Sequence, residues 1–171
     1  PLFYFGQGGK GGIRRKTYLD NVGGRVPTNF WPFSETGHTD EAKKEMLAIF
    51  DGKAQFDTPK PHRLIEFVLK IAGSEDALIL DSFAGSGTTA HAVLDMNKAD
   101  GGHRKFILVE MGDYADTTTA ERVKRVINGY GEGKNAVEGT GGSFSYYELG
   151  ERLLQPDGNL NESVGTDRIR D

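Results

Sequence analysis

Cysteine is absent from this sequence of 171 residues, which excludes disulfides and thiolate metal sites. The four histidines are scattered along the chain rather than paired at helical spacing, so we predict that the protein binds no metal. No apolar run approaches the roughly 20 residues that a membrane-spanning helix needs, and we expect no secretory leader. We therefore expect a single cytoplasmic domain with no membrane contact.

An excess of positive charge is also lacking, since the formal net charge is −4. A protein that binds DNA over its whole surface needs many lysines and arginines to displace counterions from the phosphates. We therefore do not expect this chain to bind DNA in that way. A local basic patch is present within a glycine-rich stretch near the start, formed by Lys10, Arg14, Arg15, Lys16 and Arg25. Arg14, Arg15 and Lys16 are our candidate DNA contacts, and a solvated loop is the alternative interpretation.

Hydrophobic periodicity divides the chain into alternating strands and helices. We predict strands at 2–5, 77–80, 105–110 and 143–149, and helices at 40–50, 62–72, 88–96 and 120–127. Asp40 is the expected cap of the first helix, and Thr118 with Glu121 forms a capping box for the last. The continuous apolar run 77–80 is typical of a strand that is buried on both faces. The fold class predicted is α/β, with a mostly parallel, doubly wound sheet and helices on both faces.

A glycine-rich turn, DSFAGSGTTA, follows the strand at 77–80, where ligands of such sheets bind. It is not a phosphate-binding Walker loop, because Thr88 stands where that loop requires a lysine. The spacing of Gly85, Gly87 and Ala90 does fit a dinucleotide turn, and Glu110 lies at a suitable distance to bind a ribose. A nicotinamide-binding oxidoreductase is therefore one hypothesis.

Asp81 favours a different ligand, because a carboxylate at 4 Å would repel a pyrophosphate by roughly 4 kcal/mol at an effective dielectric constant of 20. S-adenosylmethionine reverses this preference, since its ammonium and sulfonium groups are cationic. Gly85 and Gly87 would let its amino acid end approach the backbone, Glu110 would accept the ribose hydroxyls, and Met111 or a neighbouring apolar side chain would lie against the adenine. The alternative is a plain turn that binds nothing.

The segment DSFAGSGTTAHAV resembles the S-adenosylmethionine motif of amino-group DNA methyltransferases, in particular the modification subunits of type III restriction systems. Three further segments are similar to elements of the same family: WPFSETGHTDEAKKEMLAIF, FDTPKP with the helix after it, and KFILVE. The resemblance covers roughly residues 3 to 150. It implies a Rossmann-like methyltransferase sheet that is incomplete in this chain.

The resemblance also assigns the cofactor-binding residues. On the methionine and ribose side it places Asp81, Phe83, Ala84, Gly85 and Gly87, with Thr88 and Thr89 near the carboxylate of the cofactor. Thr58, Lys60 and Pro61 are implied to close the same pocket, with Lys60 as the partner of that carboxylate.

The catalytic motif of the family, a polar residue followed by two prolines and an aromatic, is missing, because the sequence contains no adjacent prolines. The segment at 29–33 has only one proline and cannot replace it. We therefore predict no catalytic residue in this chain. We therefore expect the chain to be a fragment of a larger enzyme, and its start at PLFYF without methionine also suggests this. We expect the fragment to be inactive alone.

These observations predict the cofactor-binding part of a DNA methyltransferase that methylates the amino group of adenine, with cytosine as the alternative acceptor. A non-catalytic interaction module is a further hypothesis. We expect residues 1–33 to end a target-recognition region, residues 34–150 to form the cofactor-binding core, and residues 151–171 to be a polar tail. The resemblance implies DNA as a partner, and it allows a restriction subunit and a homodimer.

Overall fold

A computed structural model describes residues 3–4, 7–15, 18 and 26–164 of the chain. The elements before the core are β1 (Phe3–Tyr4), η1 (Gln7–Gly9), β2 (Arg14–Arg15) and α1 (Phe33–Thr36). The core contains α2 (Thr39–Ile49), α3 (His62–Ala72), β3 (Leu78–Asp81), α4 (Thr88–Asp100), β4 (Lys105–Leu108), η3 (Ala115–Ala120) and α5 (Glu121–Asn128). After the core come β5 (Gly129–Tyr130), η4 (Gly133–Asn135) and β6 (Val137–Glu138).

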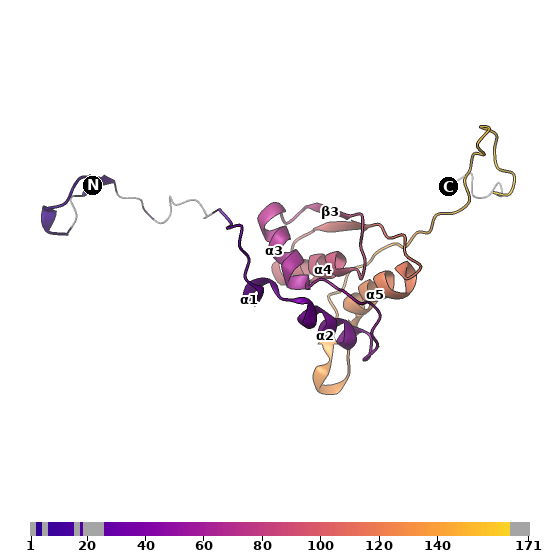
Figure 1. The fold of residues 1–171 in the computed structure, drawn as a ribbon, viewed down its shortest axis with the longest axis horizontal. Helices are drawn as coiled ribbons and strands as arrows, with labels where there is room; N and C mark the ends of the chain where they lie inside the picture. The colour runs from indigo at the N-terminus through magenta and orange to yellow at the C-terminus, as the bar shows by residue number, and fades with distance from the viewer. Residues whose placement is uncertain (1–2, 5–6, 16–17, 19–25, 165–171) are drawn as a thin grey trace.

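The centre of the fold is a pair of parallel strands, β3 and β4, with α4 as the connection between them. Asp81 is aligned with Leu108, so both strands end at the same edge. The predicted strands at 77–80 and 105–110 are thus confirmed to within two residues, and the α/β class with a parallel sheet is also confirmed. Figure 1 shows β3 at the top, with α3, α4 and α5 below it.

The core lies between the helices and one face of this sheet. Helix α4 is at its centre, and eight of its residues are buried. One cluster joins α4 to α2 and α5 through Met46, Ile49, Phe50, Ala90, Leu94, Val123 and Val126. A second cluster joins α4 to α3 through Leu69, Ala92, Val93 and Met96. Ile79 and Phe106 pack on these clusters from the sheet.

The opposite face of the sheet is exposed, which corrects two predictions. Side chains alternate between the faces of a strand, and Leu78 and Leu80 point away from the helices with 64% and 65% of their surface exposed. The prediction that β3 is buried on both faces is therefore wrong. Helices cover only one face of the described sheet, rather than both.

The third predicted core strand is also not formed. Residues 141–150 are all described, and none of them is in a strand. Instead, the segment Gly142–Tyr147 passes beside β4 and lines a cavity there. Of the predicted strand at 2–5, Phe3–Tyr4 are confirmed and pair antiparallel with Arg14–Arg15, whereas residues 2 and 5 lie outside the described residues.

Two predicted helix caps are wrong. The first long helix begins at Thr39 and is capped by His38, whose Nδ1 accepts a hydrogen bond from the backbone N–H of Glu41 at 3.2 Å. Helical backbone before α5 begins at Ala115 as a π-helix, so Thr118 lies inside the helix and is buried. No helix among the described residues is long and apolar enough to cross a membrane.

Candidate cofactor-binding site

The glycine turn connects the end of β3 to the start of α4, as the sequence predicts. Gly85 and Gly87 both have positive φ, at 53° and 77°. Residues that carry a Cβ atom rarely adopt this left-handed conformation, whereas glycine adopts it readily. A Cβ atom on Gly87 would lie 3.0 Å from the backbone oxygen of Thr119, and one on Gly85 would lie 3.3 Å from the ring of Phe56. Both positions therefore favour glycine for conformation, and Gly87 also for space, because its neighbour is backbone rather than a side chain.

Asp81 lies at the tip of β3 and is tied to the turn by two hydrogen bonds. Its Oδ1 accepts from the backbone N–H of Phe83 at 3.1 Å, and its Oδ2 accepts from the hydroxyl of Thr89 at 2.5 Å. Thr89 belongs to the first turn of α4. The carboxylate is thus fixed in direction at the mouth of the turn.

Glu110 follows β4 and also faces the turn, so the two acids lie at neighbouring strand tips. Its Oε2 accepts from the backbone N–H of Gly85 at 2.7 Å, and its Oε1 accepts from Met111 and Gly112, both at 2.9 Å. Partial burial raises the pKa of Glu110, but the N–H groups of Gly112 and Gly85 and the Tyr114 hydroxyl outweigh it, and the net shift is downward. The ionised carboxylate therefore holds the turn in addition to any role toward a ligand.

A cavity of about 260 Å³ opens beside the turn. Eight of the residues that the sequence assigns to cofactor binding line it: Thr58, Lys60, Asp81, Phe83, Ala84, Gly85, Thr88 and Thr89. The segment FDTPKP and the glycine turn are more than twenty residues apart in sequence, and the fold makes them two walls of one cavity. The structure thus brings together most of the predicted set.

Four predicted residues do not line this cavity. Pro61 is buried before α3, and Gly87 is buried before α4, so both shape the walls from behind. Glu110 instead borders a second cavity. Met111 has 90% of its surface exposed, so its side chain points to solvent rather than across the turn.

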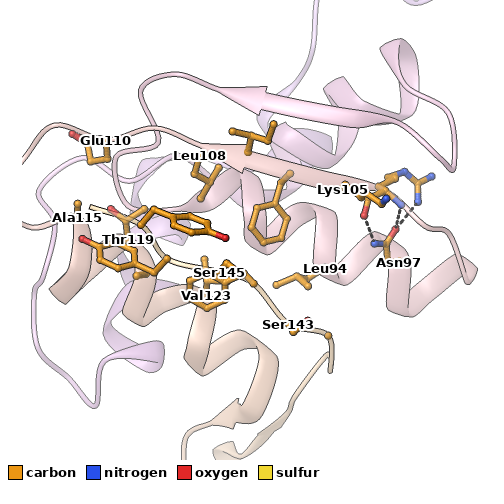
Figure 2. Close-up of a pocket in the computed structure, with 18 residues that line it drawn as sticks. Leu94, Asn97, Lys105, Leu108, Glu110, Ala115, Thr119, Val123, Ser143 and Ser145 are labelled. Atoms are coloured by element: carbon orange, nitrogen blue, oxygen red, sulfur yellow. Dashed lines mark hydrogen bonds between the residues drawn. The ribbon is translucent and has the colours of Figure 1, made fainter. Parts of the chain in front are cut away.

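The second cavity, of about 690 Å³, lies along β4 and was not predicted from the sequence. Figure 2 shows it between β4, helices α4 and α5, and the segment that includes Ser143 and Ser145. Phe106, Phe144, Tyr146 and Tyr147 give it an aromatic lining. This cavity exists because the aromatic segment lies near β4 without pairing to it as a strand.

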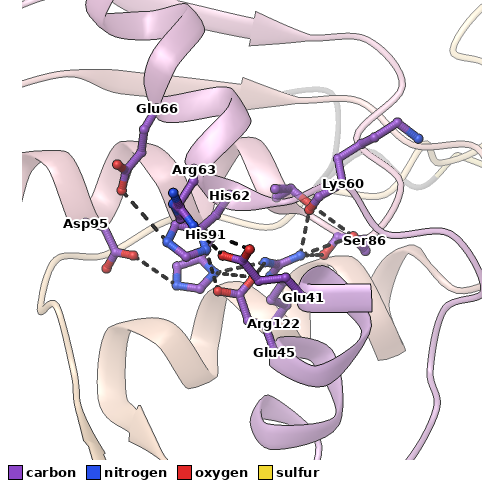
Figure 3. A network of polar contacts seen from close by, with 11 residues as sticks. Glu41, Glu45, Lys60, His62, Arg63, Glu66, Ser86, His91, Asp95 and Arg122 are labelled. Atoms are coloured by element: carbon purple, nitrogen blue, oxygen red, sulfur yellow. Dashed lines mark hydrogen bonds and ion pairs between the residues drawn. The ribbon is translucent and has the colours of Figure 1, made fainter. Parts of the chain in front are cut away.

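Sequence reasoning also missed a polar cluster behind the turn, shown in Figure 3. His62 and His91, which are far apart in sequence, stack with ring centroids 5.0 Å apart. Together with Glu45 they could hold a metal, as could His62, Glu66 and Asp95. The guanidinium of Arg122 is 2.9 Å from both Glu45 and His91 and would repel a cation from the first group. In the second group, burial lowers the pKa of His62, but the hydrogen bond to Glu45 outweighs it and the pKa is raised. A raised pKa favours the protonated imidazole, which cannot bind a metal through the nitrogen that carries the proton.

One sequence signal could have identified this cluster. Arg122 lies on the same helical face as Val126, four residues later, which is the buried face of α5. A charged side chain within an apolar stripe requires a buried partner. The candidate DNA contacts Arg14 and Arg15 are exposed on β2, whereas Lys16 and Arg25 lie outside the described residues.

The fold and the turn define a class of protein: an α/β domain whose parallel strands end at one edge, where ligands of such sheets usually bind, with an acid at each strand tip. Comparison with known proteins gives the family. Residues 9–121 match the model of the DNA methylase family, and the chain belongs to that family.

The chain is similar to modification enzymes in bacteria and a phage. It is 46% identical over 107 residues to the Mod subunit of the type III restriction-modification enzyme StyLTI of Salmonella typhimurium, covering 63% of this chain and 16% of that subunit. It is 51% identical over 73 residues to the type II methyltransferase M.KpnI of Klebsiella pneumoniae, covering 43% and 17%. It is 34% identical over 105 residues to the Mod subunit of EcoPI of Escherichia phage P1, covering 61% and 16%.

The matches span about a sixth of the length of these relatives. They confirm the resemblance to amino-group DNA methyltransferases of the type III modification kind. They give no support to the nicotinamide alternative that the glycine spacing left open.

Proposed function

We propose that this chain is the S-adenosylmethionine-binding part of a DNA methyltransferase that modifies the exocyclic amino group of adenine. The observation that carries the proposal is the cavity in which Asp81, the glycine turn and the FDTPKP segment meet. Family membership and the names of the relatives support the reaction class. The cofactor would supply an activated methyl group on a positively charged sulfur.

The donor set of the cavity fits that cofactor better than it fits a phosphate. Asp81 presents a fixed negative charge, which attracts an ammonium or sulfonium and repels a pyrophosphate by roughly 4 kcal/mol at 4 Å with an effective dielectric constant of 20. Lys60 lies on the opposite wall and offers an ammonium to a carboxylate. Charges of opposite sign on the two walls match the amino acid end of the cofactor.

The remaining residues of the site bind and orient. The positive φ of Gly85 and the absence of a side chain there let a ligand approach the backbone. Thr88 and Thr89 are buried at the start of α4, and Thr89 fixes the carboxylate of Asp81. Glu110 holds the N–H of Gly85, and we propose that it also accepts the ribose hydroxyls at the turn.

The acceptor base and the DNA would be handled elsewhere in the complete enzyme, since these 171 residues contain no motif with adjacent prolines. Positioning of the amino group against the methyl donor is what such a motif provides. We therefore propose that this chain is inactive alone, and that it acts with DNA and with a restriction subunit in the assembled system. Arg14 and Arg15 are proposed phosphate contacts.

Calorimetric titration of the chain with S-adenosylmethionine and with NAD tests the cofactor. We expect binding of the first and none of the second, and tighter binding of NAD would refute the assignment. Asp81→Asn should weaken S-adenosylmethionine by at least tenfold, because the attraction between opposite charges is lost. Asp76→Asn is the matched control, since Asp76 is exposed before the other end of β3 and the change in charge is the same.

A further inference from the structure

Arg122 on α5 has none of its surface exposed, and its guanidinium reaches the back of the glycine turn. Nη1 donates to the hydroxyl of Thr88 at 2.9 Å and to the hydroxyl of Ser86 at 3.1 Å. Both of these residues also line the cavity proposed to bind the cofactor. Ser86 and Thr88 therefore lie between the arginine and the cavity, and Arg122 contacts them on the side away from the proposed ligand.

The other side of the guanidinium is held by two groups from different helices. Nη2 donates to Oε2 of Glu45 on α2 and to Nδ1 of His91 on α4, each at 2.9 Å. An arginine can only donate, so Nδ1 of His91 accepts and Nε2 carries the proton. That Nε2 is 3.1 Å from the carboxylate of Asp95, which fixes the ring. The planar fork thus has a defined orientation (Figure 3).

The cluster also reaches the second wall of the cavity. Oε1 of Glu45 pairs with Nδ1 of His62 at 2.5 Å, and His62 directly follows the FDTPKP segment. The hydroxyl of Thr88, besides accepting from Arg122, donates to the backbone oxygen of Lys60 at 3.3 Å. One buried cation therefore connects the turn and the opposite wall through hydrogen bonds.

Burial raises the pKa of Glu45, but the hydrogen bond from His62 and the positive charge of Arg122 lower it, and the net shift is downward. Glu45 is therefore the ionised partner that compensates the buried guanidinium. A buried charge without such a partner is costly, so a substitution of either residue leaves the other buried without compensation.

We propose that Arg122 is a positioning residue of the cofactor pocket: with Glu45 as its anchor, it fixes Ser86 and Thr88 in the geometry that the ligand requires. This inference rests on the proposed function. Helix α5 contributes no residue to the lining of the cavity, yet through Arg122 it sets the affinity of the pocket.

The test compares Arg122→Lys and Arg122→Met with a matched control on the same helix. Arg125 also makes two ion pairs, to Asp51 and Glu121, but does not touch the turn. S-adenosylmethionine affinity is measured by calorimetry on the full chain, at a temperature well below the unfolding midpoint of each variant. We expect Arg122→Met to lower the affinity at least tenfold and Arg122→Lys to lower it less, while Arg125→Met stays within twofold of the original chain.

The outcomes are distinguishable. If the unaltered chain does not bind S-adenosylmethionine, the proposed function fails, and this inference fails with it. If the unaltered chain binds and a folded Arg122→Met binds equally well, only the positioning role is overturned. An equal loss in Arg125→Met would also overturn it, because the effect would then be general to the packing of α5.

Should Arg122→Met not fold, Glu45→Gln decides instead, since it keeps the arginine but neutralises its anchor. Unchanged affinity for S-adenosylmethionine in Glu45→Gln would overturn the inference.

Discussion

Two glycines at the two ends of α4 allow the crowding of the glycine turn to be measured. Gly87 precedes the helix with φ 77°, and Gly101 follows it with φ 72°. A Cβ on Gly101 would meet nothing within 4 Å, whereas a Cβ on Gly87 would lie 3.0 Å from the backbone oxygen of Thr119. The substitutions Gly87→Ala and Gly101→Ala therefore share the conformational strain and differ in the steric contact.

The expected magnitudes follow from these two contributions. Left-handed backbone costs a residue with a side chain about 1–2 kcal/mol, which the reduced entropy of the unfolded chain offsets in part, so we expect Gly101→Ala to cost about 1 kcal/mol. Gly87→Ala must also displace the backbone at Thr119, whose hydroxyl is held by the backbone oxygen of Gly85 at 2.6 Å. Overpacking of this kind adds roughly 1–3 kcal/mol, so the total is about 2–4 kcal/mol.

Thermal unfolding followed by circular dichroism measures both effects. For a chain of this length each 1 kcal/mol lowers the midpoint by about 2–4 °C, so Gly101→Ala should lose a few degrees and Gly87→Ala at least twice as much. Gly87→Ala should also weaken S-adenosylmethionine, and Gly101→Ala should leave it unchanged. Equal losses of stability in the two variants would show that the contact with Thr119 is absent and that the turn is not tightly packed.

The remaining predictions concern the charged groups. Burial lowers the pKa of His62, but the hydrogen bond that its ring N–H donates to Glu45 outweighs this effect and raises the pKa above the ordinary value of 6.5. This contribution to stability is therefore complete below pH 6.5 and is lost as the pH rises through the higher folded value. Urea unfolding from pH 5 to pH 9 should show that decline, and Glu45→Gln should flatten it; a decline that persists would place its cause elsewhere. In the complete enzyme, Arg14→Ala or Arg15→Ala should reduce the slope of log affinity for DNA against log salt by about 0.9, whereas Lys43→Ala on the exposed face of α2 should leave it unchanged.

Local sequence determined the elements that surround the site. The apolar run at β3, the glycine pair and the helix after it are specified by residues close together in the chain, because strand alternation, positive φ and helical periodicity are local properties. The same local signals placed an acid at each strand tip, since Asp81 is the last residue of β3 and Glu110 lies two residues after the end of β4. Most of the predicted cofactor residues line the cavity for this reason.

Local signals failed where a partner distant in sequence decides the outcome. Residues 143–149 have strand-forming side chains, but a strand also needs hydrogen bonds from a neighbour, and the structure gives them none. Residues 77–80 are all apolar, so the sequence does not reveal which side chains of β3 face the helices and which are exposed. Only the tertiary structure shows that Leu78 and Leu80 are on the exposed face. His38 rather than Asp40 caps α2, because the ring nitrogen reaches the free N–H of Glu41.

Sequence by itself therefore determined the family, the two central strands and the glycine turn after the first of them, because the motifs that specify each of these are short segments of the chain. Tertiary structure alone decided that α5 supports this turn through Arg122, and that Glu45, His62 and His91 gather behind it. A buried charge must be neutralised by whatever the fold brings next to it, and sequence spacing does not reveal which residues those are.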